Sequence, residues 1–256
     1  MRATRIYPDT KMRFFTKFFH LAFASIALLW ACGMPLAHAE DAPYLRLDTA
    51  LVEGDDENQF EFATRYSGSN GDSITKASLG YSFNPLLSVE VQLGHTEYRN
   101  GDDREAEVEL STRYVLVDHN RDDWGLALKA AYQQQSSGNA SFMEEGPALN
   151  VVFTKPFGEK TGNLHLNLGA SRQNSKVNTS ATWGIGVDVP LAQRAMLFAE
   201  FSGRDTTDQV IHGGMRWWLK YGKIALDTSM SNTMTFGDSG SATERYHIGL
   251  VFFDLR

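Results

Sequence analysis

The sequence contains a single cysteine, Cys32, among its 256 residues. A lone thiol cannot build an intramolecular disulfide scaffold or supply the paired cysteines of a CxxC zinc or redox site. The acidic turn at residues 205–208 lacks the oxygen-ligand spacing of a calcium loop, and the glycine pair Gly184 and Gly186 is too short for a dinucleotide-binding motif. We therefore expect no metal and no cofactor.

Basic residues are also in deficit, with 24 Lys and Arg against 31 Asp and Glu. Residues 1–39 contain five of the basic residues and one of the acidic residues. The remainder therefore has 19 basic and 30 acidic residues and a net charge of −11. Because phosphate binding needs a basic face, this balance argues against a nucleic-acid partner.

The sequence has little continuous apolar character. Its apolar run at residues 18–30 is shorter than the roughly 20 residues that a transmembrane helix needs. The mean hydropathy of −0.32 excludes a helical membrane bundle. It does not exclude a membrane β-barrel, because only half of the residues in each spanning strand are apolar.

Residues 1–39 have the layout of a secretory signal peptide. A charged segment at residues 11–17 precedes the apolar run, and Ala37-His38-Ala39 forms an A-x-A cleavage site. Met12 is the expected true start, and Glu40 is the expected first residue of the exported chain. The alternative is a lipoprotein signal ending at Cys32, which is disfavoured because the neighbouring Trp30 is bulky for such a box.

From residue 58 onward, apolar residues recur with a period of two. In one example, Leu164, Leu166 and Leu168 alternate with polar or small residues. Each run has about 9–12 residues, enough for a tilted strand to cross a bilayer. Eleven polar connections separate twelve such runs. This pattern predicts an all-β protein, a transmembrane antiparallel up-and-down β-barrel over residues 58–256.

The alternation also fits a soluble all-β protein, such as a periplasmic sandwich or a lipocalin-like barrel. A soluble barrel packs its apolar side chains inside, and a membrane barrel inverts this arrangement. Strand length, the even strand number and the export signal favour the membrane barrel.

Aromatic residues add to this preference, because they gather near both ends of the predicted strands. The chain is exported, so the first strand should ascend from the periplasm and the last should descend to it. The predicted periplasmic girdle contains Tyr81, Phe83, Tyr114, Trp124, Phe153, Trp217 and Phe252. The predicted outer girdle contains Tyr66, Tyr132 and Tyr246.

From about residue 58 to its C-terminus, the chain resembles the bacterial outer-membrane β-barrel proteins. The resemblance is carried by the turn YSFNP at residues 81–85 and by the strand at residues 246–253. That strand is similar to the C-terminal signal read by the barrel-insertion machinery, although residues 254–256 follow its aromatic end. The resemblance implies a Gram-negative outer membrane, insertion by that machinery, and contact with outer-membrane lipid and lipopolysaccharide.

The polar face of the predicted strands should line the lumen. Its acidic residues are Glu61, Glu90, Glu107, Glu109, Asp188, Glu200 and Asp227. Its basic residues are Arg65, Lys76, Arg113, Lys129, Arg216 and Arg245, together with the histidines His165, His212 and His247. Strongly ion-selective pores carry one sign of charge, whereas this lumen is nearly balanced. Twelve strands enclose less space than the sixteen of a porin. We expect a narrow channel or transporter for small solutes.

Residues 40–57 form a separate acidic segment around the strand-like run Leu45, Leu47, Thr49 and Leu51. It is interpreted as a periplasmic tail or a plug. The remaining alternative is that it forms the first strand and that a later strand is misjudged.

No catalytic constellation stands out. His95 shares its face with apolar residues and should point outward, and no motif places a serine beside the inward-facing His212. We therefore expect no enzymatic activity. Two alternatives to the channel remain: a non-conducting barrel that serves envelope integrity, and a lipid-modifying outer-membrane enzyme.

Cleavage after Ala39 gives a direct prediction. Mass spectrometry of the membrane-inserted protein should find an N-terminus that begins Glu40-Asp41-Ala42-Pro43. A mature chain that begins at a lipid-modified Cys32 would contradict the signal-peptide interpretation.

Overall fold

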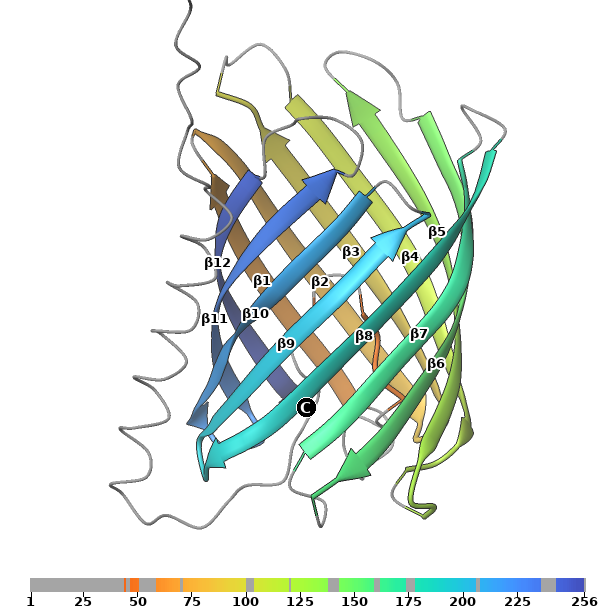
Figure 1. Cartoon of the computed structure of the whole chain (residues 1–256), viewed down its shortest axis with the longest axis vertical. Helices are drawn as coiled ribbons and strands as arrows, with labels where there is room; N and C mark the ends of the chain where they lie inside the picture. Colours follow the sequence, from red (N-terminus) through yellow and green to blue (C-terminus); the bar gives the residue numbers. More distant parts are fainter. Residues whose placement is uncertain are drawn as a thin grey trace, which may run out of the picture.

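The computed structural model describes residues 44, 47–50, 59–69, 71–99, 104–119, 121–137, 143–158, 162–173, 178–205, 208–235 and 243–255. These residues form twelve β-strands and no helix (Figure 1). This part of the chain thus contains no helix long and apolar enough to cross a membrane. The predicted signal peptide lies outside the described residues.

The strands follow one another along the chain at short intervals. They are β1 (Gln59–Ser69), β2 (Asp72–Asn84), β3 (Leu87–Glu97), β4 (Arg104–Val117), β5 (Gly125–Ser137), β6 (Met143–Phe157), β7 (Gly162–Gln173), β8 (Asn178–Ala192), β9 (Ala195–Arg204), β10 (Asp208–Lys220), β11 (Ile224–Thr235) and β12 (Thr243–Leu255).

The sheet closes on itself because β1 pairs antiparallel with both β2 and β12. Arg65 illustrates the closure, since it lies opposite Lys76 of β2 and Gly249 of β12. All other strands pair with their neighbours in the sequence. The described strands therefore leave no open sheet edge, and the predicted twelve-strand up-and-down barrel is confirmed.

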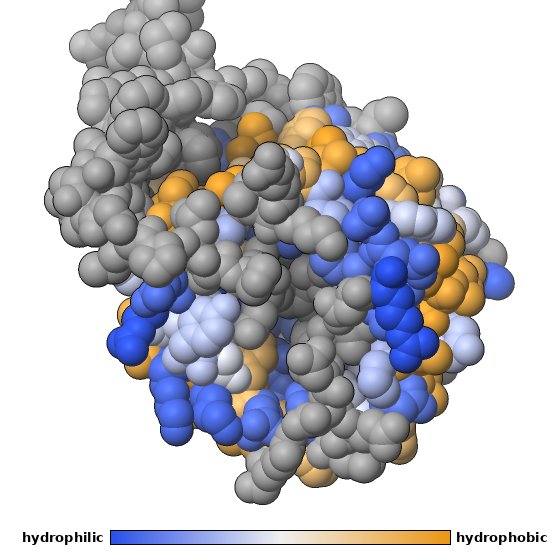
Figure 2. Space-filling model, turned by 90° about the horizontal axis from the view of Figure 1, so that it is seen from below, coloured by the Kyte–Doolittle hydropathy of each residue, from blue (hydrophilic) through white to orange (hydrophobic). Residues whose placement is uncertain are grey.

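The burial pattern shows which way the two faces point. On β7, Leu166 and Leu168 are 38% and 67% exposed, whereas His165 and Asn167 are 0% and 6% exposed. Hydrophobic residues accordingly lie along the outer edge of the barrel in the view from below (Figure 2). Most large apolar side chains of the strands point outward, and the buried charged side chains point inward. This is the arrangement of a membrane barrel, and it excludes the soluble-barrel alternative.

The two ends of the barrel differ in which strands terminate there (Figure 1). Even-numbered strands end at the lower end of the view, and odd-numbered strands end at the upper end. The aromatic residues assigned to the periplasmic girdle lie toward the lower end of their strands or, for Trp124, just before β5. Tyr66, Tyr132 and Tyr246 lie toward the upper end and are 37–54% exposed.

Some connections between the strands are very short. β1 continues to Ser69, and β2 begins at Asp72. Gly71 permits this tight turn because its φ of 106° is accessible to glycine. Similarly, β6 continues through Pro156, which pairs with Asn163 next to the end of the strand. A proline is tolerated there because few ladder hydrogen bonds remain to be made.

A closed membrane barrel should resist SDS until it is heated. We expect the unboiled protein to migrate faster on SDS gels than the boiled protein, and to remain with the outer membrane during fractionation. Release by osmotic shock as a soluble protein would contradict the outward apolar face.

Candidate functional site

All sixteen side chains that the sequence pattern predicts to line the lumen are buried or half-buried in the structure. Seven of the sixteen predicted residues are buried: His165, Asp188, Glu200, His212, Arg216, Asp227 and His247. Nine are half-buried: Glu61, Arg65, Lys76, Glu90, Glu107, Glu109, Arg113, Lys129 and Arg245. The interior therefore holds charges of both signs that must be neutralised locally.

Much of this neutralisation occurs between nearby strands. Arg216 of β10 lies opposite Asp227 of β11, and its Nε and Nη2 atoms donate to the two carboxylate oxygens at 2.8 and 3.0 Å. Both side chains are about 5% exposed or less. On the other side of the barrel, Lys76 Nζ donates to Glu107 Oε1 at 3.1 Å.

The Arg216 guanidinium also lies over two aromatic rings, Trp218 at 5.6 Å and Phe253 at 5.2 Å from the ring centroids. Trp218 is buried, with 4% exposure. The sequence pattern identified Phe253 only as the aromatic end of the C-terminal strand, and it did not identify Trp218. Both could have been placed on the inner face, because alternate residues of a strand share a face, and Trp218 alternates with Arg216 as Phe253 does with His247.

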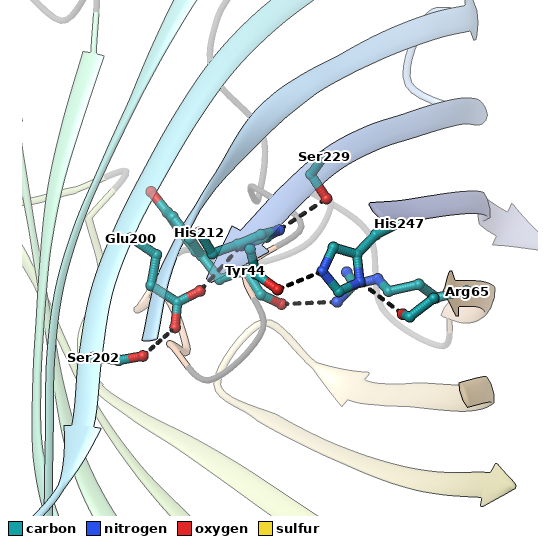
Figure 3. A network of polar contacts seen from close by, with 9 residues as sticks. Tyr44, Arg65, Glu200, Ser202, His212, Ser229 and His247 are labelled. Atoms are coloured by element: carbon teal, nitrogen blue, oxygen red, sulfur yellow. Dashed lines mark hydrogen bonds and ion pairs between the residues drawn. The ribbon is translucent and has the colours of Figure 1, made fainter. Parts of the chain in front are cut away.

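A second polar cluster surrounds two histidines (Figure 3). His212 Nε2 lies 2.8 Å from Ser229 Oγ, and His212 Nδ1 lies 3.4 Å from Glu200 Oε2. Ser202 Oγ donates to the other oxygen of Glu200 at 2.7 Å. The buried carboxylate is thus held by two partners within the wall.

His247 lies beside this cluster, with its ring centroid 5.4 Å from that of His212. Its Nδ1 is 2.6 Å from Ser67 Oγ, and its Nε2 is 2.8 Å from Ser231 Oγ. A hydroxyl can both donate and accept, so these two serines satisfy either neutral tautomer of the ring.

The third histidine, His165, lies nearer the lower end of the barrel. Its Nε2 is 2.5 Å from Asp188 Oδ2, and its Nδ1 is 2.9 Å from Thr154 Oγ1. Asn163 donates to the other oxygen of Asp188 at 3.1 Å. His165 and Asp188 are both fully buried, with 0% exposure.

Tyr44 and residues 47–50, which we call the inner segment, lie within this polar interior. Lys129 Nζ donates to Asp48 Oδ1 at 2.8 Å, and Ala50 N donates to Thr154 Oγ1 at 2.9 Å. Tyr44, Leu47, Thr49 and Ala50 are all buried. The other residues of the 40–57 segment lie outside the described part of the chain.

The hydrogen-bonded series Ser229–His212–Glu200 contains the residue types of a catalytic triad, with a nucleophile, a base and an acid that orients the base. The backbone of Ser229, however, is paired with Gly214 on one side and His247 on the other. Its peptide groups therefore belong to the sheet ladder and are not available as oxyanion donors. The arrangement is better suited to satisfying buried polar groups than to acyl transfer. The other sequence candidate, His95, is exposed and lies 3.5 Å from Glu97.

Among the described residues, no group of three or more His, Cys, Asp or Glu side chains is arranged to hold a metal ion.

The barrel is similar to several solved structures. The KdgM porin aligns with a TM-score of 0.57 at 9% identity, covering 75% of this chain and 98% of that chain. An outer membrane channel from Pseudomonas putida F1 aligns with a TM-score of 0.52 at 12% identity, covering 81% and 100%. The Acinetobacter baumannii outer membrane protein Omp33 gives 0.51 at 11% identity, covering 77% and 98%. At these identities the similarity concerns the fold.

The chain thus has the fold of the outer-membrane β-barrel proteins, as its sequence resemblance predicted. It belongs to the family described as uncharacterised conserved protein UCP029691, whose model matches residues 37–229. That match includes the inner segment and strands β1 to β10. No curated protein sequence matches the chain.

The Arg216–Asp227 pair gives a stability prediction. Asp227→Asn leaves a buried guanidinium without its counter-charge, which should cost about 3 kcal/mol or more of unfolding free energy. Urea unfolding of the refolded barrel, followed by tryptophan fluorescence, measures this cost. The matched control is Asp254→Asn, which removes the partner of the more exposed Lys223 and should cost about 1 kcal/mol or less. Equal costs for the two variants would contradict a tightly paired interior.

Proposed function

We propose that the protein resides in the outer membrane of a Gram-negative bacterium and acts as a narrow channel for small polar solutes. The observation that carries this proposal is the inverted barrel, with apolar side chains outside and a polar, charged lumen inside. A polar interior surrounded by a lipid-facing wall offers hydrophilic solutes a path through the hydrocarbon region.

The charge distribution supports passage without strong selection for one sign. The wall carries both basic and acidic residues, and pairs such as Lys76–Glu107 and Arg216–Asp227 neutralise each other. Selective pores instead concentrate one sign of charge at a constriction. A lumen of this kind favours small solutes whose polar groups can exchange hydrogen bonds with the wall.

Relatives in fold agree with this proposal. The KdgM porin and the Pseudomonas putida outer membrane channel are named for conduction and share the architecture. At such low sequence identity these structures support a shared fold only. The solute that this protein transports therefore has to be identified from the protein's own residues.

The expected partners follow from the same placement. The outward apolar face would contact outer-membrane lipid, with lipopolysaccharide at its outer rim. Strand β12 would present the C-terminal signal to the barrel-insertion machinery. Because β12 also closes the barrel against β1, recognition of this strand and closure of the sheet would involve the same segment.

A non-conducting barrel is the second candidate, and the inner segment favours it. A lumen that contains buried protein backbone has less room for solute. Under this alternative the protein would serve envelope integrity, and its interior contacts would stabilise the wall.

Planar-bilayer recording separates the two candidates. We expect the purified, heat-modifiable protein to insert and to produce discrete conductance steps in 1 M KCl. A protein that inserts but shows no conductance at any applied voltage, either unmodified or with its lumen altered, would overturn the channel proposal.

Charge substitution then tests whether ions pass through the lumen. Glu90 is half-buried on β3 in the predicted lumen face, whereas Glu97 is exposed at the end of the same strand. Glu90→Lys should shift the reversal potential in a salt gradient toward anion preference, because it makes the path more positive. The matched control Glu97→Lys should shift it much less. Identical shifts would place the current outside the lumen.

A further inference from the structure

The inner segment is held by polar contacts from several parts of the wall. Besides the contacts of Asp48 with Lys129 and of Ala50 with Thr154, Arg113 Nη1 donates to the carbonyl oxygen of Thr49 at 3.2 Å. These three anchors come from β5, β6 and β4. The segment therefore meets one side of the barrel through consecutive residues.

Tyr44 extends these contacts across the lumen. Its carbonyl oxygen accepts from Arg65 Nη1 of β1 at 3.3 Å, and its hydroxyl donates to Asp188 Oδ2 of β8 at 3.5 Å. In the closed sheet, β1 and β8 are separated by four strands in one direction and by six in the other. A single residue thus bridges nearly opposite walls, and Figure 3 shows Tyr44 reaching Arg65 beside the histidine cluster.

Two apolar patches on the inner wall lie against the same segment. Tyr44 and Leu47 form a buried cluster with Met196 and Phe198 of β9. Exposed to water in a polar lumen, these two wall side chains would lose the favourable burial they have here. The inner face of β9 near its lower end is therefore shaped for an apolar occupant.

The second patch surrounds Ala50, which is fully buried with Val115, Ala127 and Val152. These three wall residues come from neighbouring strands and point inward. Both patches are thus covered by residues of one short stretch of chain.

Inward-facing glycines provide the space that the segment occupies. A Cβ atom at Gly186 would lie 3.0 Å from Tyr44 Cε1, and its three nearest atoms all belong to Tyr44 and Leu47. A Cβ atom at Gly184 would lie 3.1 Å from Leu47 Cγ. Because Gly184 and Gly186 have no side chains, the inner segment can pack closely against β8 at these two positions.

We propose that the inner segment is a resident plug, which closes the lumen and must withdraw before a solute can pass. This proposal rests on the proposed channel function, and it adds the device that regulates the channel. Hydrogen bonds, one ion pair and two small apolar patches hold the plug, without a covalent link in the described contacts. Water and a solute can replace these polar contacts, so withdrawal leaves the barrel wall intact.

The position of the plug can be tested first by the labelling rate of an introduced thiol, which does not depend on whether the barrel conducts. Cleavage after Ala39 removes Cys32, so Thr49→Cys introduces a single thiol into the mature chain, at a position that is 4% exposed. A small charged methanethiosulfonate reagent should label it slowly in the intact barrel. Rapid labelling of this variant, at the rate of an unfolded control, would overturn the plug.

Two independent changes should expel the plug, each with a matched control. Asp48→Lys replaces the ion pair with Lys129 by repulsion, and Asp122→Lys makes the same charge change on an exposed turn. Gly186→Val fills the cradle, whereas Gly80→Val adds the same side chain at an inward position with atoms no nearer than 3.8 Å. Asp48→Lys and Gly186→Val should each raise the labelling rate of the Thr49→Cys thiol and the mean conductance several-fold. Asp122→Lys and Gly80→Val should leave the labelling rate and the conductance near those of the protein without these changes.

A disulfide should have the opposite effect. A Cβ atom at Gly125 would lie 3.2 Å from Ala50 Cβ, near the separation of about 3.8 Å in disulfides. The oxidised Ala50→Cys, Gly125→Cys protein should remain in its low-conductance state, and reduction should restore the behaviour of the unmodified protein.

The outcomes distinguish the plug from the channel. If expelled variants are labelled quickly but never conduct, the plug stands and the channel proposal fails. If the unmodified, expelled and oxidised proteins conduct equally, the channel stands and the plug proposal fails. Heat modifiability of every variant confirms that the barrel has formed.

Discussion

Pairing of the first strand with the last is the interaction on which the rest of this structure depends. In hydrocarbon, each unpaired backbone N–H or C=O group costs several kcal/mol, so an open sheet edge cannot face lipid. The ladder from Phe60↔Leu255 to Gly68↔Tyr246 removes both edges at once. Once the sheet is closed, alternate residues must face either lipid or the interior, and the chemistry of each position follows from its parity.

Closure also accounts for the dense polar contacts inside. Side chains from all twelve strands converge on a confined space, where a charge without a partner would be costly. The wall residues neutralise these charges in short-range pairs such as Arg216 with Asp227. Histidines lie between hydroxyl and carboxylate groups that bind their ring nitrogens. The inner segment extends the same principle, because its carbonyl and carboxylate oxygens accept hydrogen bonds from wall cations.

The sequence was sufficient to predict properties that depend on period and length. The number of strands, their order and the membrane-barrel class all follow from alternation in runs such as residues 164–169. Contacts across the lumen could not be predicted in this way. Ser229 meets His212 although the register places it opposite Gly214, because the side chains reach diagonally between strands. Met196 and Phe198 are apolar although they point inward, where polar residues were expected. Their apolar character is explained by the structure, because both side chains pack against Tyr44 and Leu47.

The covalent attachment of the inner segment to β1 has a further consequence. Eight residues separate Ala50 from Gln59, where the first strand begins. A tether of this length keeps a withdrawn segment at an effective concentration on the order of millimolar near its binding surface. A free solute that uses the same wall groups would have to compete with that concentration. Return of the segment would be a unimolecular step, so the time to reseal would not depend on how many copies of the protein the membrane holds.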